Sequence, residues 1–247
     1  MTGVIAAKEF RALFASPLAW VLLAVLQIVL AWIFLGRLDA FLELQPRLAR
    51  FGNAPGFTEM VAAPAFGAGA LVLLMVMPLL TMRLIAEERR QQTLPLLSAA
   101  PVSAGAIVAG KFLGLMAFLL LPVLMLAAMS ASLAVGGAPD WGLIAANALG
   151  LALLAAAFAA VGLLFSSLTA QPAVAAVATL GTLLSLWMLD LSAAETRGPL
   201  YQLSLMRRFE NFNQGVFDSY DVAYLLLATA LFLALAVNRL DAERWRG

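Results

Sequence analysis

The chain has 247 residues, of which 64% are hydrophobic and only 12% are charged, whereas an ordinary soluble domain carries about 25% charged residues. The sequence contains neither His nor Cys, which excludes disulfide frameworks and the catalytic triads and metal sites that depend on these side chains. The net charge of +1 and the lack of a basic block give no indication of nucleic-acid binding. The composition therefore indicates an all-α integral membrane protein with several spanning helices.

Six apolar stretches are long enough to cross a bilayer, because a spanning helix needs about 20 residues and must satisfy its own backbone hydrogen bonds. We expect transmembrane helices over residues 17–36, 66–84, 107–135, 141–166, 171–191 and 222–239. Together they form a single transmembrane domain over residues 1–247. No small-residue cleavage pattern follows the first stretch, so we interpret it as a retained helix and not as a signal peptide.

The basic residues predict the orientation of these helices, since Lys and Arg accumulate in cytoplasmic segments. If the N-terminus is inside, the cytoplasmic segments contain Lys8, Arg11, Arg83, Arg89, Arg90, Lys111, Arg239, Arg244 and Arg246. The outer segments then contain the smaller group, Arg37, Arg47, Arg50, Arg197, Arg207 and Arg208. Because the number of spans is even, the C-terminus is also expected in the cytoplasm.

Two outer loops are predicted, at residues 37–65 and 192–221. The first mixes apolar and charged residues, which fits either an amphipathic helix on the outer leaflet, interrupted near Pro46, or a solvated loop. The second has phenylalanines at near-helical spacing, which indicates an interfacial or re-entrant helix, with Ser219 or Asp221 as the cap of the last span. In this loop we expect an outer partner or a substrate to meet Phe209, Phe212, Gly215 and Phe217, with Gly215 also a plausible helix break.

The cytoplasmic loop at residues 83–106 is the longest polar element on the inner side. It starts with a cluster of charges and then turns apolar, and Thr93 before Leu94-Pro95 is expected to cap a short helix. Such a helix either anchors two spans or docks into a groove of a soluble partner, and the pattern alone leaves both open. The candidate docking residues are Glu87, Glu88, Arg89, Arg90, Gln91, Gln92, Thr93, Leu94, Leu96 and Leu97.

The stretch GAIVAGKF at residues 105–112 nearly matches a phosphate-binding loop, but Phe112 stands where a hydroxyl would bind Mg²⁺, and no strand precedes it. We therefore expect this chain to bind no nucleotide, cofactor or metal itself. Lys111 is interpreted as the cytoplasmic start of the third span, while Gly110 and Gly114 permit close approach of another helix.

Hydroxyl-bearing residues between the fourth and fifth spans are interpreted as helix-end caps and not as nucleophiles, since no base lies near them in sequence. They are Ser166, Ser167 and Thr169. No ionisable residue lies well inside a predicted span, which disfavours a proton relay through the membrane.

Four stretches resemble the permease subunits of the ABC-2 class of ABC transporters, and are most similar to the gliding-motility type. They are KEFRALFASPLAW (8–20), TMRLIAEERRQQTLPLLSAAPVSAGAIVAGKFLG (81–114), LLFSSLTAQPAVA (163–175) and FENFNQGVFDSYDVAYLL (209–226). The second carries the strongest signature, in which an acidic-basic cluster, Thr-Leu, Leu-Leu, Pro-Val and Gly-Lys follow in this order. The chain departs from the family at Gln92, where Gly is usual, and at Pro95, where Glu is frequent.

The resemblance implies a non-catalytic permease subunit of an ATP-driven transporter in a bacterial inner (cytoplasmic) membrane. It implies a second permease copy and two cytoplasmic ABC ATPase subunits that bind ATP and Mg²⁺, and it favours docking over anchoring for residues 83–101. It also allows a further partner, a membrane-anchored protein with a large extracytoplasmic domain. The complex would then export a substrate or transmit force to that partner.

Three alternatives remain at this point. One is the permease of a periplasmic metal-cofactor maturation system, which has a similar architecture. Another is a membrane scaffold that transports nothing. The third is an intramembrane enzyme, but the sequence contains no group of residues that could act together in catalysis.

Overall fold

The computed structural model describes residues 2–48, 56–92, 102–193 and 204–244, and every regular element in these ranges is a helix. In chain order these are α1 (Thr2–Ala15), α2 (Pro17–Leu48), η1 (Thr58–Ala62), α3 (Ala63–Thr81), α4 (Ala86–Arg90), α6 (Ala104–Ala131), η2 (Ser132–Val135), α7 (Trp141–Leu168), α8 (Pro172–Ala193), α9 (Leu205–Asn213) and α10 (Ser219–Arg244). Six helical stretches are long and apolar enough to cross a membrane, which confirms the predicted fold class.

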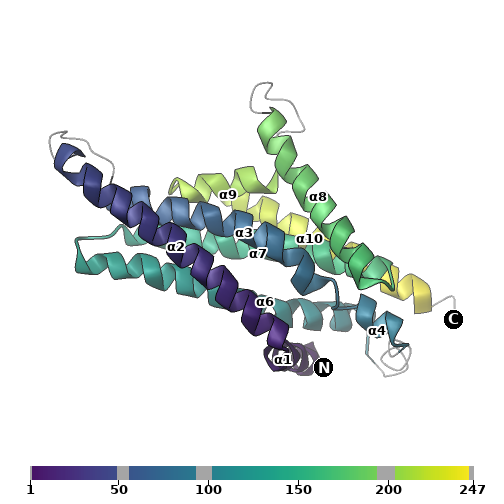
Figure 1. Ribbon diagram of the computed structural model, residues 1–247. Coiled ribbons are helices and arrows are strands. Elements are labelled where there is room, and N and C mark those ends of the chain that lie inside the picture. The colour runs from purple at the N-terminus through teal and green to yellow at the C-terminus, as the bar shows by residue number, and fades with distance from the viewer. Residues whose placement is uncertain (1, 49–55, 93–101, 194–203, 245–247) are drawn as a thin grey trace.

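The helices form an elongated bundle in which α1, α4 and the last turns of α10 lie at one end (Figure 1). The distribution of basic residues predicts that this end is cytoplasmic, and we name it the cytoplasmic end. The opposite end carries η2, α9 and the end of α2, and we name it the outer end.

Helix α7 lies at the centre of the bundle and contacts α3, α6, α8, α9 and α10. It is the most deeply buried of the six spans, and its sequence explains why, since it is rich in Ala and Gly. Small residues allow helix backbones to approach closely where lipid provides no hydrophobic drive for association. An added Cβ at Gly150 would lie 2.6 Å from the Cβ atom of Phe212 on α9, and one at Gly162 would collide with Thr81 on α3.

Helices α2, α8 and α10 lie at the periphery and keep long apolar faces exposed. Trp32 on α2 is 80% exposed, Val177 on α8 is 72% exposed and Leu227 on α10 is 69% exposed. Exposed faces of this kind are normal for spanning helices, whose solvent is the hydrocarbon of the bilayer.

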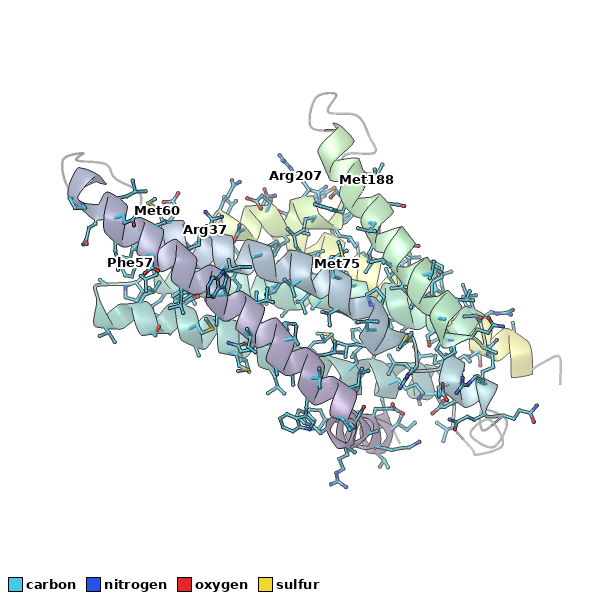
Figure 2. The ribbon with its side chains drawn as sticks, in the orientation of Figure 1. Arg37, Phe57, Met60, Met75, Met188 and Arg207 are labelled. Carbon is cyan, nitrogen blue, oxygen red and sulfur yellow. The ribbon has the colours of Figure 1, made fainter. Side chains whose placement is uncertain are left out.

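The predicted end of the first span at residue 36 is not a helix end, because α2 continues through residues 37–48. Its 32 residues make a helix about 48 Å long at 1.5 Å per residue, longer than the hydrocarbon core of about 30 Å. The helix is not interrupted at Pro46, but it ends two residues later at Leu48, as expected for a residue that removes a backbone hydrogen bond from the helix. Arg37 lies on this extension (Figure 2).

The helix of the second span begins earlier than the sequence indicated. The π-helical turn η1 leads directly into α3, so residues 58–65, which the sequence predicts as part of the outer loop, are helical. Thr58 Oγ1 accepts a hydrogen bond from the backbone N–H of Asp140 (3.0 Å), which ties this turn to the start of α7.

Candidate functional site

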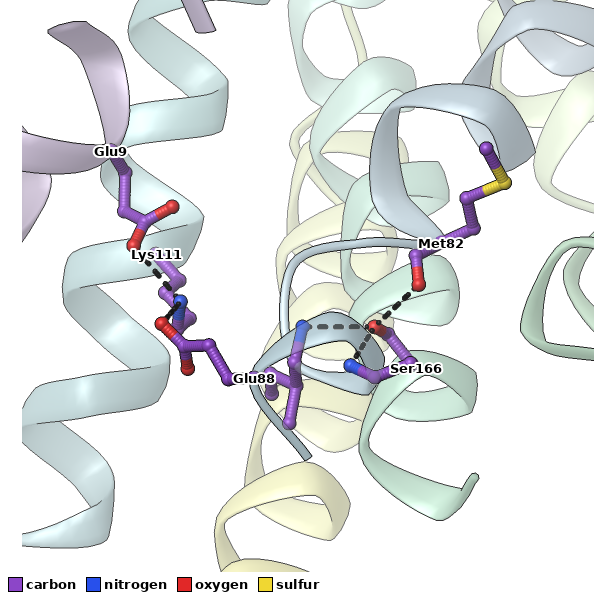
Figure 3. A network of polar contacts seen from close by, with 7 residues as sticks. Glu9, Met82, Glu88, Lys111 and Ser166 are labelled. Carbon is purple, nitrogen blue, oxygen red and sulfur yellow. Dashed lines mark hydrogen bonds and ion pairs between the residues drawn. The ribbon is translucent and has the colours of Figure 1, made fainter. Parts of the chain in front are cut away.

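The start of α4 is held by a side chain from another helix (Figure 3). Ser166, near the end of α7, accepts hydrogen bonds through Oγ from the backbone N–H groups of Ile85 (3.0 Å) and Ala86 (3.1 Å), and donates to the carbonyl oxygen of Met82 (3.2 Å). The first N–H groups of a helix have no partner within it and need an acceptor of this kind. Ser166 is therefore a cap, as predicted, but it caps α4 across the bundle and not its own helix.

A buried lysine joins α4 to two further helices. Lys111 Nζ lies 2.9 Å from Glu9 Oε1 on α1 and 2.8 Å from Glu88 Oε1 on α4, and its side chain is only 1% exposed (Figure 3). Lys111 is not at the start of α6, because the helix begins at Ala104 and the lysine lies about two turns inside it. The interpretation of Lys111 as a boundary marker is thus corrected, since it is an internal partner for two carboxylates.

Two glycines beside Lys111 bring α1 onto α6. An added Cβ at Gly110 would lie 2.7 Å from Ile5 Cβ, and one at Gly114 would lie 2.9 Å from the carbonyl oxygen of Ala6. Any larger residue would separate the helices at this crossing. The two glycines therefore allow Glu9 on α1 to come within ion-pair distance of Lys111. The predicted close approach of another helix at Gly110 and Gly114 is confirmed, and that helix is α1.

The structure separates the predicted docking residues into inward and outward groups. Glu88 binds Lys111, and the Arg89 guanidinium donates to the carbonyl oxygen of Ser167 at the end of α7. Arg90 and Gln91 both donate to the carboxylate of Glu87 near the surface (2.9 and 2.7 Å). Arg90, Gln91 and Gln92 are exposed, while Thr93, Leu94, Leu96 and Leu97, including the predicted cap at Thr93, lie outside the described residues.

Gln92 ends α4 in the left-handed region, with φ of 57°. Glycine adopts this conformation without a steric penalty, whereas a residue with a Cβ loses roughly 1–2 kcal/mol. This geometry gives a physical reason for the glycine that is usual at this position in the permeases that the chain resembles.

We expect Gln92→Gly to raise the free energy of unfolding by about 1 kcal/mol, because it relieves this strain. The measurement is the thermal unfolding midpoint of the purified protein in detergent. Gln91→Gly is the matched control, since Gln91 has φ of −83° and glycine there should destabilise by about 0.5–1 kcal/mol. Equal shifts for the two variants would contradict the assignment of strain to Gln92.

At the outer end, α9 packs inward against α7. Phe209 and Phe212 are 1% and 0% exposed and belong to the core, so within this structure they offer no surface to an outer partner. Phe217 is 63% exposed and is the phenylalanine of the predicted set that faces outward. Gly215 ends the helix, as predicted, with φ of 77°. The N–H groups of Gly215 and Val216 donate to the carbonyl oxygens of Phe212 (3.0 Å) and Asn211 (2.9 Å), the pattern of a Schellman motif.

A buried carboxylate links α9 to the first turn of α10. Asp221 is 1% exposed, and its oxygens accept from Arg208 Nη1 (3.1 Å) and Asn211 Nδ2 (2.6 Å). The Arg208 guanidinium also lies over the rings of Tyr220 and Tyr224, 4.7 and 5.0 Å from their centroids.

The prediction that Ser219 or Asp221 caps α10 is wrong. The backbone N–H of Tyr220 donates to Asp218 Oδ1 (2.9 Å), and the carbonyl oxygen of Asp218 accepts from the N–H groups of Asp221 and Val222. Asp218 is therefore the cap, which leaves the Asp221 carboxylate available for Arg208 and Asn211.

Sequence reasoning missed Glu9, the cross-helix role of Ser166 and the pairing of Lys111. A usable signal was present for the lysine. An ionisable residue inside an apolar helix is costly unless a partner of opposite charge reaches it, and the predicted inner segments contain five acids that could do so, Glu9, Glu87, Glu88, Asp241 and Glu243.

Comparison with known proteins gives the family. A sequence model of the family described as ABC-2 family transporter protein matches residues 3–245. No curated protein shows a significant match to the chain. The match includes all six candidate spans, α4 with its polar contacts, and α9. Since it covers nearly the whole chain, the protein belongs to the ABC-2 transporter family, whose members are the membrane components of ABC transporters and pair with ABC ATPase subunits.

Proposed function

We propose that this chain is a permease subunit that dimerises and receives the motion of cytoplasmic ATPase subunits through α4 and the segment after it. Two permease copies and two ATPase subunits would form the complex in a bacterial cytoplasmic membrane. ATP and Mg²⁺ would bind to the ATPase subunits. The complex would export a substrate or pass force to a membrane-anchored partner with a large extracytoplasmic domain, which would meet the exposed Phe217 at the outer end.

The observation that supports this proposal is the polar network around α4. The helix is joined to α3 by the chain itself, to α7 by Ser166 and the contact of Arg89 with Ser167, and to α6 and α1 by Lys111. A displacement of α4 would therefore act on four helices at once. One of them is α7, which also contacts α3, α6, α8, α9 and α10.

The exposed side of α4 leaves room for a partner. Arg90, Gln91 and Gln92 face outward, and the apolar Leu94, Leu96 and Leu97 follow directly. A few apolar side chains at the centre of an interface with charged residues around them is a common arrangement at protein interfaces. We therefore assign the contact with the ATPase to this exposed edge and to residues 93–97, and the transmission of motion to Glu88, Arg89 and Lys111.

We expect the double substitution Leu96→Asp/Leu97→Asp to weaken ATPase binding about thirtyfold or more, since an interface residue of this kind contributes about 2 kcal/mol. The permease is co-expressed with its ABC ATPase subunit, and ATPase occupancy is measured after purification in detergent. Val135→Asp is the control, because Val135 is 94% exposed at the outer end and should retain full occupancy. If the double variant still binds the ATPase at full occupancy, the segment is only a membrane anchor. That result would favour the alternative of a membrane scaffold that transports nothing.

A further inference from the structure

A polar pocket at the cytoplasmic end lies beside α4 and includes Glu87 and Arg90, whose contact is described above. It lies between the turn after α3, α4 and the start of α8, and it has a volume of about 460 Å³. Arg83, Glu87, Arg90 and Gln171 supply its polar lining, and Met82 and Pro172 supply part of its apolar lining.

The charge in this pocket is positive and only partly balanced. The Glu87 carboxylate already accepts hydrogen bonds from Arg90 and Gln91. The Arg83 side chain takes part in none of the hydrogen bonds or ion pairs within residues 2–48, 56–92, 102–193 and 204–244, although its charge acts on Glu87. The pocket wall also includes the first turn of α8, where the helix dipole adds further positive potential.

The pocket lies where spanning helices reach the membrane surface. Helix α3 ends at Thr81, two residues before Arg83, and the apolar stretch of α8 begins at Pro172. In a bilayer this is the depth of the phospholipid headgroups. Basic pockets between spanning helices on the cytoplasmic side are typical sites for acidic headgroups.

We propose that this pocket binds the phosphate headgroup of an anionic phospholipid from the cytoplasmic leaflet, with Arg83 as its main contact and Arg90 as the second. The mixed lining fits this ligand, because a headgroup presents a phosphate to the arginines and an apolar backbone to Met82 and Pro172. A carboxylate side chain from a protein partner would fill only a small part of the volume. The lipid would join α4 to the start of α8, next to the helix that we assign to coupling.

The test uses the purified permease alone, so it does not depend on the proposed ATPase contact. The protein is stripped of lipid in detergent and offered phosphatidylglycerol or phosphatidylcholine, and retained lipid is measured by native mass spectrometry. We expect wild type to retain phosphatidylglycerol in preference to phosphatidylcholine, and Arg83→Gln/Arg90→Gln to lower its affinity for phosphatidylglycerol about tenfold. Arg83→Lys/Arg90→Lys should keep most of the binding, which separates loss of charge from misfolding.

A matched control removes the same charge elsewhere at the same end. Lys8 and Arg11 are exposed on α1, and Lys8→Gln/Arg11→Gln should leave retention of phosphatidylglycerol unchanged. Equal loss in both double variants would indicate general attraction to the surface and would overturn the site, as would equal retention of the two lipids by wild type. If Arg83→Gln/Arg90→Gln leaves lipid retention unchanged, the proposal is wrong. A separate co-purification with the ATPase then shows whether the same variant loses the ATPase, which would make the pocket a partner contact.

Discussion

Replacing Lys111 by methionine is expected to lower the free energy of unfolding by about 3–5 kcal/mol, the usual range when one member of a buried ionic group is removed. Methionine has a similar length and keeps the packing along α6, but it leaves Glu9 and Glu88 facing each other without the ammonium group that now lies 2.9 and 2.8 Å from them. The measurement is the thermal or denaturant midpoint of the purified protein in detergent.

The control for this substitution is Lys8→Met, which removes the same charge from the exposed side of α1. A solvent-exposed lysine of this kind should change stability by less than about 0.5 kcal/mol. If Lys111→Met is no more destabilising than Lys8→Met, the three-residue contact is absent in the protein.

A triple substitution separates stability from transmission of motion. Replacing a complete buried ionic group by neutral side chains is often nearly neutral for stability, so Lys111→Met/Glu9→Gln/Glu88→Gln should regain most of the loss. We still expect the triple variant to lose the response of the outer end to the ATPase, because α4 is no longer tied to α1 and α6 by charge.

The absence of cysteine in the chain makes this response measurable. A spin label on Val135→Cys, at the outer end, reports the distance between the two copies in the assembled complex. In the wild-type background, trapping the ATPase with vanadate should change that distance, whereas in the triple variant it should not. An unchanged response in the triple variant would show that the network only stabilises the fold.

The spanning helices were predictable because their signal is strong and local. A run such as residues 141–166 has no charge and enough length to cross the bilayer, and a continuous apolar run of this length satisfies its backbone hydrogen bonds in lipid as a helix. The course of α2 beyond residue 36 was harder to predict. Its amphipathic residues fit a straight extension, a surface helix and a loop equally well, and contacts with the rest of the bundle, such as the ring of Phe41 lying 6.2 Å from that of Phe57, favour the extension.

The polar contacts could not be predicted in the same way, because they join residues far apart in sequence. Lys111 lies 102 residues from Glu9, and Ser166 lies 81 residues from Ile85. Sequence pattern identifies the charged cluster at residues 87–90, but not which members turn inward. That division depends on how α4 lies on α6 and α7, and it turns the partly buried Glu88 and Arg89 toward the bundle and leaves Arg90 exposed.

The second large effect is expected at the outer end, where Asp221→Asn should destabilise the protein by about 3 kcal/mol. The carboxylate now accepts one hydrogen bond on each oxygen, from Arg208 and from Asn211. An asparagine side chain presents an NH₂ group in place of one oxygen, so a donor faces a donor, and the Arg208 guanidinium, 13% exposed, loses the negative charge of Asp221.

The same substitution three residues earlier provides the control. Asp218 is exposed and caps α10, and asparagine caps a helix about as well as aspartate, so Asp218→Asn should change stability by only a few tenths of a kcal/mol. Hydrogen exchange then locates the damage. In Asp221→Asn the amides of α9 should exchange faster while those of α7 stay protected, since the lost contacts join α9 to α10 and leave the centre of the bundle intact. Equal exchange in α9 and α7, or equal destabilisation by the two substitutions, would show that Asp221 does not hold α9 in place, and that apolar packing, such as that of Phe212 against Gly150, does so instead.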